Sequence, residues 1–188
     1  MLIMVAAMDK WRVVVEELLD AEDHPALLRL SRDAPARMLR YLTARLCSED
    51  SETKWRAVRA LGALAADPSL LTEEKLTEQL RRYMWSLNDE SGAVPFGVPE
   101  AIGEILARRP SLQEAFLPLI CSMAHEEETS QTGAIERGVI WAIGRVGEPA
   151  LRWDLDLGEI RRIAEEHPDP ETRRVAAWAI RRLEAGRW

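Results

Sequence analysis

Residues 135–146 read IERGVIWAIGRV, and three other segments of the chain superpose on them without a gap. These segments are ETKWRAVRALGAL (52–64), FGVPEAIGEI (96–105) and ETRRVAAWAIRRL (171–183). Their central aliphatic residues are 41, 41 and 37 residues apart, at Leu61, Ile102, Ile143 and Ile180. This period is close to the ~40–47 residues of known two-helix repeats, so the sequence predicts stacked helical pairs.

Three more columns of this alignment are apolar in every segment. Position −1, counted from the central residue, is always alanine, and positions −4 and +3 are always aliphatic or alanine. These columns are Ala60, Ala101, Ala142 and Ala179; Ala57, Val98, Val139 and Ala176; and Leu64, Ile105, Val146 and Leu183. At about 100° per residue the offsets −4, −1, 0 and +3 share one helix face, which we expect to be buried.

The rest of the chain also favours short helices. Period-2 alternation and hairpin turn pairs are nearly absent, and Pro, Gly, Asp and Ser separate helical stretches. Partner helices are predicted at 72–88, 111–127 and 155–167, between the repeated ones. The fold prediction is a single all-α domain over 1–188: a right-handed α-α superhelix (solenoid) of about four helical pairs over 51–188. Residues 1–50 match the repeat poorly and are predicted to form an irregular N-terminal helical cap, as terminal units of repeat arrays often do.

The repeats carry a resemblance to a known family. The stretch DPETRRVAAWAIRRL (169–183), with an acidic Pro-containing turn before an Arg-bearing helix, resembles the HEAT-like repeat of the phycobilin-lyase type. The ALG and AIG runs at 60–62, 101–103 and 142–144 are similar to the helix end of that repeat. Residues 84–105 also resemble a stretch of uncharacterised bacterial HEAT-repeat proteins. The resemblance covers about 52–186 and implies an α-solenoid, most often a protein-binding scaffold.

Composition narrows the class of protein. The 188 residues are 47% hydrophobic and 30% charged, with a net charge of −7, which fits a folded globular chain and argues against nucleic acid as a partner. Two cysteines are too few for a disulfide scaffold and favour a reducing compartment. No segment has the ~18–20 uninterrupted apolar residues of a membrane span, and the first residues, MLIMVAAMDKW, lack a basic leader. We therefore expect a cytoplasmic protein that makes no membrane contact.

The opposite helix face carries the candidate binding residues. Positions −6 and −2 are expected to point away from the core, and residues four apart are neighbours on a helix. Each repeat then places one aromatic ring beside one charge, which is the composition of an interface hot spot. The predicted partner-binding residues are Trp55, Arg59, Phe96, Glu100, Arg137, Trp141, Arg174 and Trp178. The alternative is that these rings fill space where repeats stack.

A second candidate is the loop SLNDESGAVPFGV at 86–98, the longest run of turn-forming residues. Long inter-helix loops of repeat proteins often lie at binding surfaces. Its polar candidates are Asn88, Asp89 and Glu90. The alternative is a structured connection that widens one repeat.

Catalytic and metal chemistry find little support in the sequence. Cys121 and His125 lie four residues apart, but a structural zinc needs four ligands and no second pair exists. Phosphate-binding loops and nucleophile elbows are absent. We predict no catalytic residue, no metal and no cofactor, and a scaffold that docks a protein or peptide on the Trp/Arg stripe. The alternatives are a HEAT-like DNA alkylation-repair protein, which a Trp- and Arg-bearing inner face resembles, and a bilin-lyase-like tetrapyrrole handler.

Overall fold

Helices make up most of the described part of the chain. A computed structural model describes residues 2–87, 96–124 and 133–185, with side chains from Lys10 onward, and these residues contain no β-strand. The described α-helices are α1 (Leu2–Asp20), α2 (His24–Ser31), α3 (Pro35–Arg45), α4 (Ser51–Ala66), α5 (Glu73–Leu87), α6 (Val98–Arg108), α7 (Gln113–Met123), α9 (Gly133–Val146), α10 (Leu157–Glu166) and α11 (Pro170–Glu184). Short 3-10 turns cover Pro110–Leu112 and Glu148–Arg152. The all-helical prediction is confirmed for the described residues.

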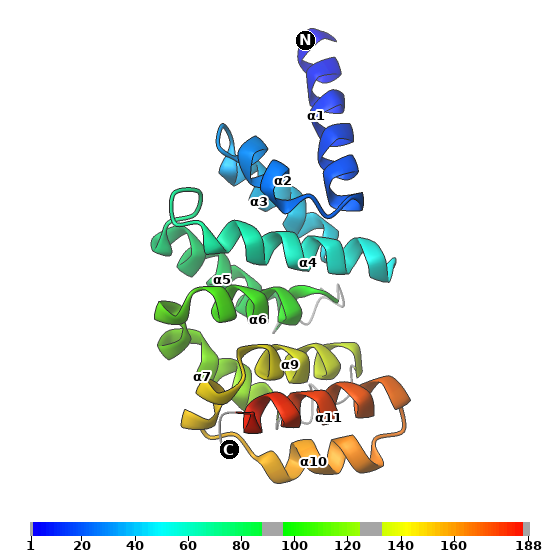
Figure 1. The fold of residues 1–188 in the computed structure, drawn as a ribbon, viewed down its shortest axis with the longest axis vertical. Helices are drawn as coiled ribbons and strands as arrows, with labels where there is room; N and C mark the ends of the chain where they lie inside the picture. Colours follow the sequence, from blue (N-terminus) through cyan, green and yellow to red (C-terminus); the bar gives the residue numbers. More distant parts are fainter. Residues whose placement is uncertain (1, 88–95, 125–132, 186–188) are drawn as a thin grey trace.

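Four helices form a row along the length of the molecule. Helices α4, α6, α9 and α11 pack side by side in that order, and all four begin on the right-hand side of Figure 1. They are the four helices that carry the repeated segments. A second helix packs against each of them: α3 on α4, α5 on α6, α7 on α9 and α10 on α11. Helix α1 projects from the opposite end to α10 (Figure 1).

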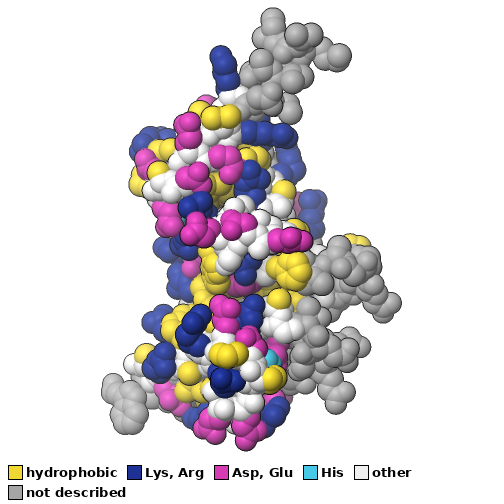
Figure 2. Space-filling view, turned by 90° about the vertical axis from the view of Figure 1, so that its right-hand side faces the viewer, with side chains coloured by type: hydrophobic (Ala, Val, Ile, Leu, Met, Phe, Trp, Pro, Cys, Tyr) yellow, Lys and Arg dark blue, Asp and Glu magenta, His cyan; other side chains and the backbone are white. Residues whose placement is uncertain are grey.

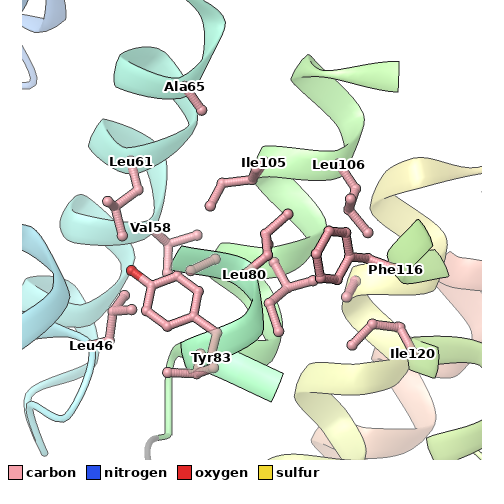
Figure 3. Close-up of a cluster of buried hydrophobic side chains, with 14 of the residues drawn as sticks. Leu46, Val58, Leu61, Ala65, Leu80, Tyr83, Ile105, Leu106, Phe116 and Ile120 are labelled. Carbon is pink, nitrogen blue, oxygen red and sulfur yellow. The ribbon is translucent and has the colours of Figure 1, made fainter. Parts of the chain in front are cut away.

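The aliphatic columns fill the interior as the pattern predicts. Fourteen of the sixteen column positions are buried, and only Val146 and Ile180 are partly exposed. Ile180 lies on α11, the last helix of the row, where no further repeated helix covers it. Figure 3 shows part of this core, in which Leu80 of α5 lies between the side chains of α4, such as Leu61, and Phe116 of α7.

Glycine lets neighbouring helices of the row approach closely. A Cβ added at Gly103 would lie 2.6 Å from Cα of Ala142, and one at Gly144 would lie 2.7 Å from Cα of Ala179. The glycine that follows each central aliphatic residue of α6 and α9 thus meets the alanine of the next repeat. Backbone contact of this kind fixes the spacing within the row.

Aspartates cap four of the described helices at their start: Asp23 for α2, Asp50 for α4, Asp156 for α10 and Asp169 for α11. Asp50 accepts a hydrogen bond from N–H of Thr53 at 2.8 Å, and Asp156 accepts one from N–H of Gly158 at 2.8 Å. Asp169 accepts from N–H of Thr172 at 3.0 Å. Each cap satisfies N–H groups that the first turn leaves unpaired. None of the described helices is long and apolar enough to cross a membrane.

Candidate functional site

A pocket opens where the row helices begin. It encloses about 480 Å³ and draws its lining from all four helices of the row and from the segment before α4. The lining residues are Ser48, Glu49, Ser51, Lys54, Trp55, Phe96, Glu100, Ala134, Arg137, Trp141, Glu171 and Val175. Figure 2 looks onto this side of the molecule, where hydrophobic side chains lie between acidic and basic ones.

Three tryptophans from three helices meet beside this pocket. The rings of Trp55 (α4) and Trp141 (α9) are 4.9 Å apart between centroids at an angle of 62°. Trp141 in turn stacks on Trp178 of α11, with centroids 5.8 Å apart and planes at 16°. All three side chains are partly exposed. Edge-to-face and offset-stacked pairs of this geometry are favourable for aromatic rings. We call the pocket together with Trp178 the aromatic groove.

Glu100 departs from the sequence prediction. It was expected to face outward, but the residue is only 3% exposed. The prediction is wrong because neighbouring helices cover the side chain: Lys54 of α4 donates to Oε1 at 3.0 Å, and Gly138 of α9 lies against Oε2. Oε2 has no hydrogen-bond partner among the described residues. Burial raises the pKa of Glu100, and the charges of Lys54 and Arg137 oppose that rise.

Each predicted arginine already has a carboxylate partner within the chain. Arg137 binds Asp169 at 2.9 Å, and Arg59 binds Glu22 at 2.5 Å. Arg174, which is highly exposed, lies 3.4 Å from Glu171. The cation near the Trp55 ring is Lys54, whose Nζ is 5.1 Å from the ring centroid. Arg137 therefore links α9 to the segment before α11, and the guanidinium groups of Arg59 and Arg174 also have carboxylate partners.

Asp169 links the groove to the start of α11. Its carboxylate accepts from the Thr172 hydroxyl at 2.7 Å as well as from backbone N–H groups of the first turn. These hydrogen bonds, first of all those from Thr172, hold the pKa of Asp169 well below its usual range. The carboxylate stays charged at neutral pH, which keeps Arg137 in place.

The structure brings most of the predicted binding residues together. Trp55, Phe96, Glu100, Arg137 and Trp141 line one pocket, and Trp178 stacks on Trp141. Arg59 lines a neighbouring, smaller hollow of about 230 Å³ beside Glu22, and Trp55 lines both hollows. Arg174 does not line the pocket, although its partner Glu171 does. The loop candidates Asn88, Asp89 and Glu90 lie outside the described residues.

Lys54 is the functional candidate that the sequence prediction missed. It lies seven residues before Leu61, so it falls within about 20° of the core-facing column. A lysine at a core-facing position of the first turn needs a charged partner, and it meets Glu100. The position of Lys54 on the core-facing side of its helix is the signal that could have identified Lys54 and the burial of its partner Glu100.

Of Cys121 and His125, which are too few for a structural zinc site, the structure describes only Cys121. Cys121 is 1% exposed, and its Sγ lies 3.9 Å from the carbonyl oxygen of Ala150. His125 lies outside the described residues. Over residues 10–87, 96–124 and 133–185, no group of three or more His, Cys, Asp or Glu side chains is arranged to hold a metal ion.

The two cysteines are expected to differ in reactivity. Burial raises the pKa of the Cys121 thiol to about 12, whereas Cys47 is exposed. Because the thiolate is the reactive form, a disulfide reagent at pH 8 should modify one thiol per native chain and two in denaturant. A Cys47→Ser variant serves as the control and should show no rapid reaction while folded. Rapid modification of that variant would contradict the burial of Cys121.

No protein-family model matches this chain, and no curated protein matches it either. The resemblance to HEAT-like repeats stays a prediction from the sequence. The basis for a functional proposal is therefore the aromatic groove itself, in its residues, charges and exposure.

Proposed function

We propose that the protein is a non-catalytic scaffold that docks a partner protein or peptide on the aromatic groove. The observation that carries this proposal is the meeting of Trp55, Trp141 and Trp178, from three helices, at a surface where they stay partly exposed. Clustered aromatic rings at the rim of a concave pocket are typical of the few residues that dominate interface energies. Such rings offer large contact area with little conformational entropy to lose.

The architecture supports this proposal. The pairs α5/α6, α7/α9 and α10/α11 fit HEAT-like units of a right-handed α-solenoid, and α3 of the predicted N-terminal cap packs on α4 in the same way. Solenoids present extended binding surfaces. A cytoplasmic location fits the two unpaired cysteines. Both the solenoid and the location are part of the proposal.

The charges around the groove favour a polypeptide over nucleic acid. Its lining contains three carboxylates, from Glu49, Glu100 and Glu171, against the two cations of Lys54 and Arg137. Contacts to phosphate dominate the affinity of nucleic-acid-binding proteins and require an excess of unpaired basic groups. The same shortage of free cations disfavours a carboxylated tetrapyrrole.

The test is affinity enrichment from a lysate of the source cells, with the wild-type chain and a Trp141→Ala, Trp178→Ala double variant as baits. Circular dichroism first establishes that the variant keeps its helices. We expect a protein that the wild type retains and the double variant loses. Its affinity for each bait is then measured with purified proteins.

A matched control is Trp85→Ala, because Trp85 is 73% exposed on α5 and does not line the groove. This control should retain the partner as the wild type does. If the folded double variant retains the same proteins as the wild type, docking on the groove is wrong.

A further inference from the structure

The ammonium group of Lys54 occupies a site made by a carboxylate and an indole. Nζ of Lys54 lies 3.0 Å from Oε1 of Glu100 and 5.1 Å from the centroid of the Trp55 ring. A buried anion beside an aromatic face is the arrangement that binds organic cations in proteins. The chain's own lysine thus shows which kind of group this site accepts.

Glu100 is a strong acceptor with capacity left over. The residue is 3% exposed, and Oε2 has no hydrogen-bond partner among the described residues. A carboxylate can accept about four hydrogen bonds, and a buried one gains more from a positive donor than an exposed one does. The single bond from Lys54 leaves Glu100 with further attraction for a cation.

The surrounding charges favour a cation over an anion. Arg137 is held by Asp169 at 2.9 Å, so its charge is largely offset. Glu49 and Glu171 are exposed and line the same pocket, and the charge of Glu171 is partly offset by Arg174 at 3.4 Å. An incoming carboxylate would meet these acids at the entrance, whereas an incoming ammonium or guanidinium would be attracted by them.

Lys54 is the group that an incoming cation would replace, although its side chain is more enclosed than the 30% exposed side chain of Arg137. Lys54 lies in the first turn of α4, its side chain is 15% exposed, and Glu100 is the carboxylate to which it is paired. A flexible four-carbon stem allows the ammonium to swing into water, where it is strongly hydrated. Exchange of one ammonium for another leaves Glu100 with a counter-charge throughout.

We propose that a lysine or arginine side chain of the docking partner takes the place of Lys54 between Glu100 and Trp55. This inference rests on the proposed function, because it names the chemical group of the partner that enters the groove. An arginine would add stacking of its planar group on the indole rings of Trp55 and Trp141. Partners are thus selected by a basic residue, flanked by residues that cover the tryptophans.

The experiment uses three capped tripeptides, Ac-Gly-Lys-Gly-NH2, Ac-Gly-Nle-Gly-NH2 and Ac-Gly-Glu-Gly-NH2, titrated into the full chain. Binding is followed by NMR through the indole N–H signals of Trp55 and Trp141. The norleucine peptide keeps the alkyl stem but lacks the charge. We expect the lysine peptide to give saturable shifts at both indoles and to bind more tightly than the other two.

Two variants should change the affinity for the lysine peptide in opposite directions. Lys54→Met removes the competing ammonium and leaves Glu100 without its counter-charge, so the lysine peptide should bind about tenfold more tightly than to wild type. Glu100→Gln keeps the shape of the side chain and removes the charge, so the same peptide should bind about tenfold more weakly. The signal of Trp85, outside the groove, should not move in either titration.

Several outcomes would overturn the inference. One is weaker or unchanged binding of the lysine peptide to Lys54→Met, because an anion site would lose affinity with that change. Equal binding of the norleucine peptide, preference for the glutamate peptide, or the absence of saturable shifts at Trp55 and Trp141 would do the same. If Lys54→Met does not fold, the inference is tested by the order of the affinities of the three peptides for the wild type and for Glu100→Gln.

Failure of this inference can be told apart from failure of the proposed function. If binding of the enriched partner requires Trp141 and Trp178 but the partner binds Glu100→Gln as tightly as the wild type, the groove binds a partner without recognising a basic residue. If the tryptophan variant keeps all partners, the proposed function fails, whatever the peptides show.

Discussion

Replacement of Gly103 by alanine is expected to lower the free energy of unfolding by about 2 kcal/mol, since overpacking a tight interior typically costs 1–3 kcal/mol. The added Cβ would lie 2.6 Å from Cα of Ala142 and 2.8 Å from its Cβ. A backbone atom cannot turn aside as a long side chain can, so α6 and α9 must move apart. Alanine is the better helix former by about 1 kcal/mol, and the expected loss is what remains after that gain. Urea unfolding followed by circular dichroism measures it.

The control for this prediction is Gly133→Ala at the start of α9, where an added Cβ would meet nothing within 4 Å. That variant should be as stable as the wild type or slightly more stable, because alanine restricts the unfolded chain. If Gly103→Ala is also as stable as the wild type, the close contact between α6 and α9 does not exist as described.

The close approach at Gly103 belongs to the part of the fold that a sequence pattern can predict. A helix face repeats every 3.6 residues, so buried aliphatic residues recur in fixed columns whatever their neighbours are. The alanine at position −1 and the glycine at +1 fit the same logic, because two helices approach closely only where side chains are small. For this reason the burial of Ala101, Ile102 and Ala142 follows from the pattern alone.

The charges of the groove could not be assigned in the same way. The position of a residue in the repeat predicts which side of the helix it faces, but it does not predict how far a neighbouring helix covers that residue. Glu100 faces the predicted side of α6, yet Lys54 and Gly138 from the two adjacent helices enclose it. The partners of Arg59 and Arg137 are acids of other segments, which only the folded arrangement brings near, whereas Arg174 pairs with Glu171 three residues earlier on α11.

Position −7 of the repeat carries charged residues at a core-facing position, and these could have been noticed in the sequence. Lys54 and Glu136 both occupy it, one heptad before the central aliphatic residue and almost in register with it. Lys54 pairs with Glu100, and Glu136 is 6% exposed with Oε2 lying 3.1 Å from Nε2 of His167. Arg173, the third charged residue of this column, instead donates to the backbone carbonyl oxygen of Pro168 at 3.1 Å, so a charge in this register indicates a polar partner but not always an ion pair.

Another ion pair between α6 and α9, formed by Glu104 and Arg145, leads to the second large expected effect. Glu104 of α6 is 7% exposed and accepts two hydrogen bonds from the Arg145 guanidinium of α9, at 2.7 and 3.2 Å. Loss of one partner of a buried pair typically costs 3–5 kcal/mol, because the remaining charge is left uncompensated. Arg145 is itself 25% exposed, so water offsets part of that cost, and we expect Arg145→Met to lower the free energy of unfolding by about 2 kcal/mol.

The double variant Glu104→Gln, Arg145→Met separates this cause from a simple loss of packing. Glutamine keeps the volume beside Gly62 and removes the charge, so the double variant should be more stable than Arg145→Met alone. Arg108→Met is the matched control, since Arg108 lies 3.7 Å from Glu104 and its side chain is 49% exposed. An exposed ion pair is worth about 0–1 kcal/mol, so this control should be nearly neutral in urea unfolding. If the double variant is less stable than Arg145→Met, the buried charge of Glu104 is not what Arg145 compensates, and packing of the arginine stem between α6 and α9 accounts for the loss.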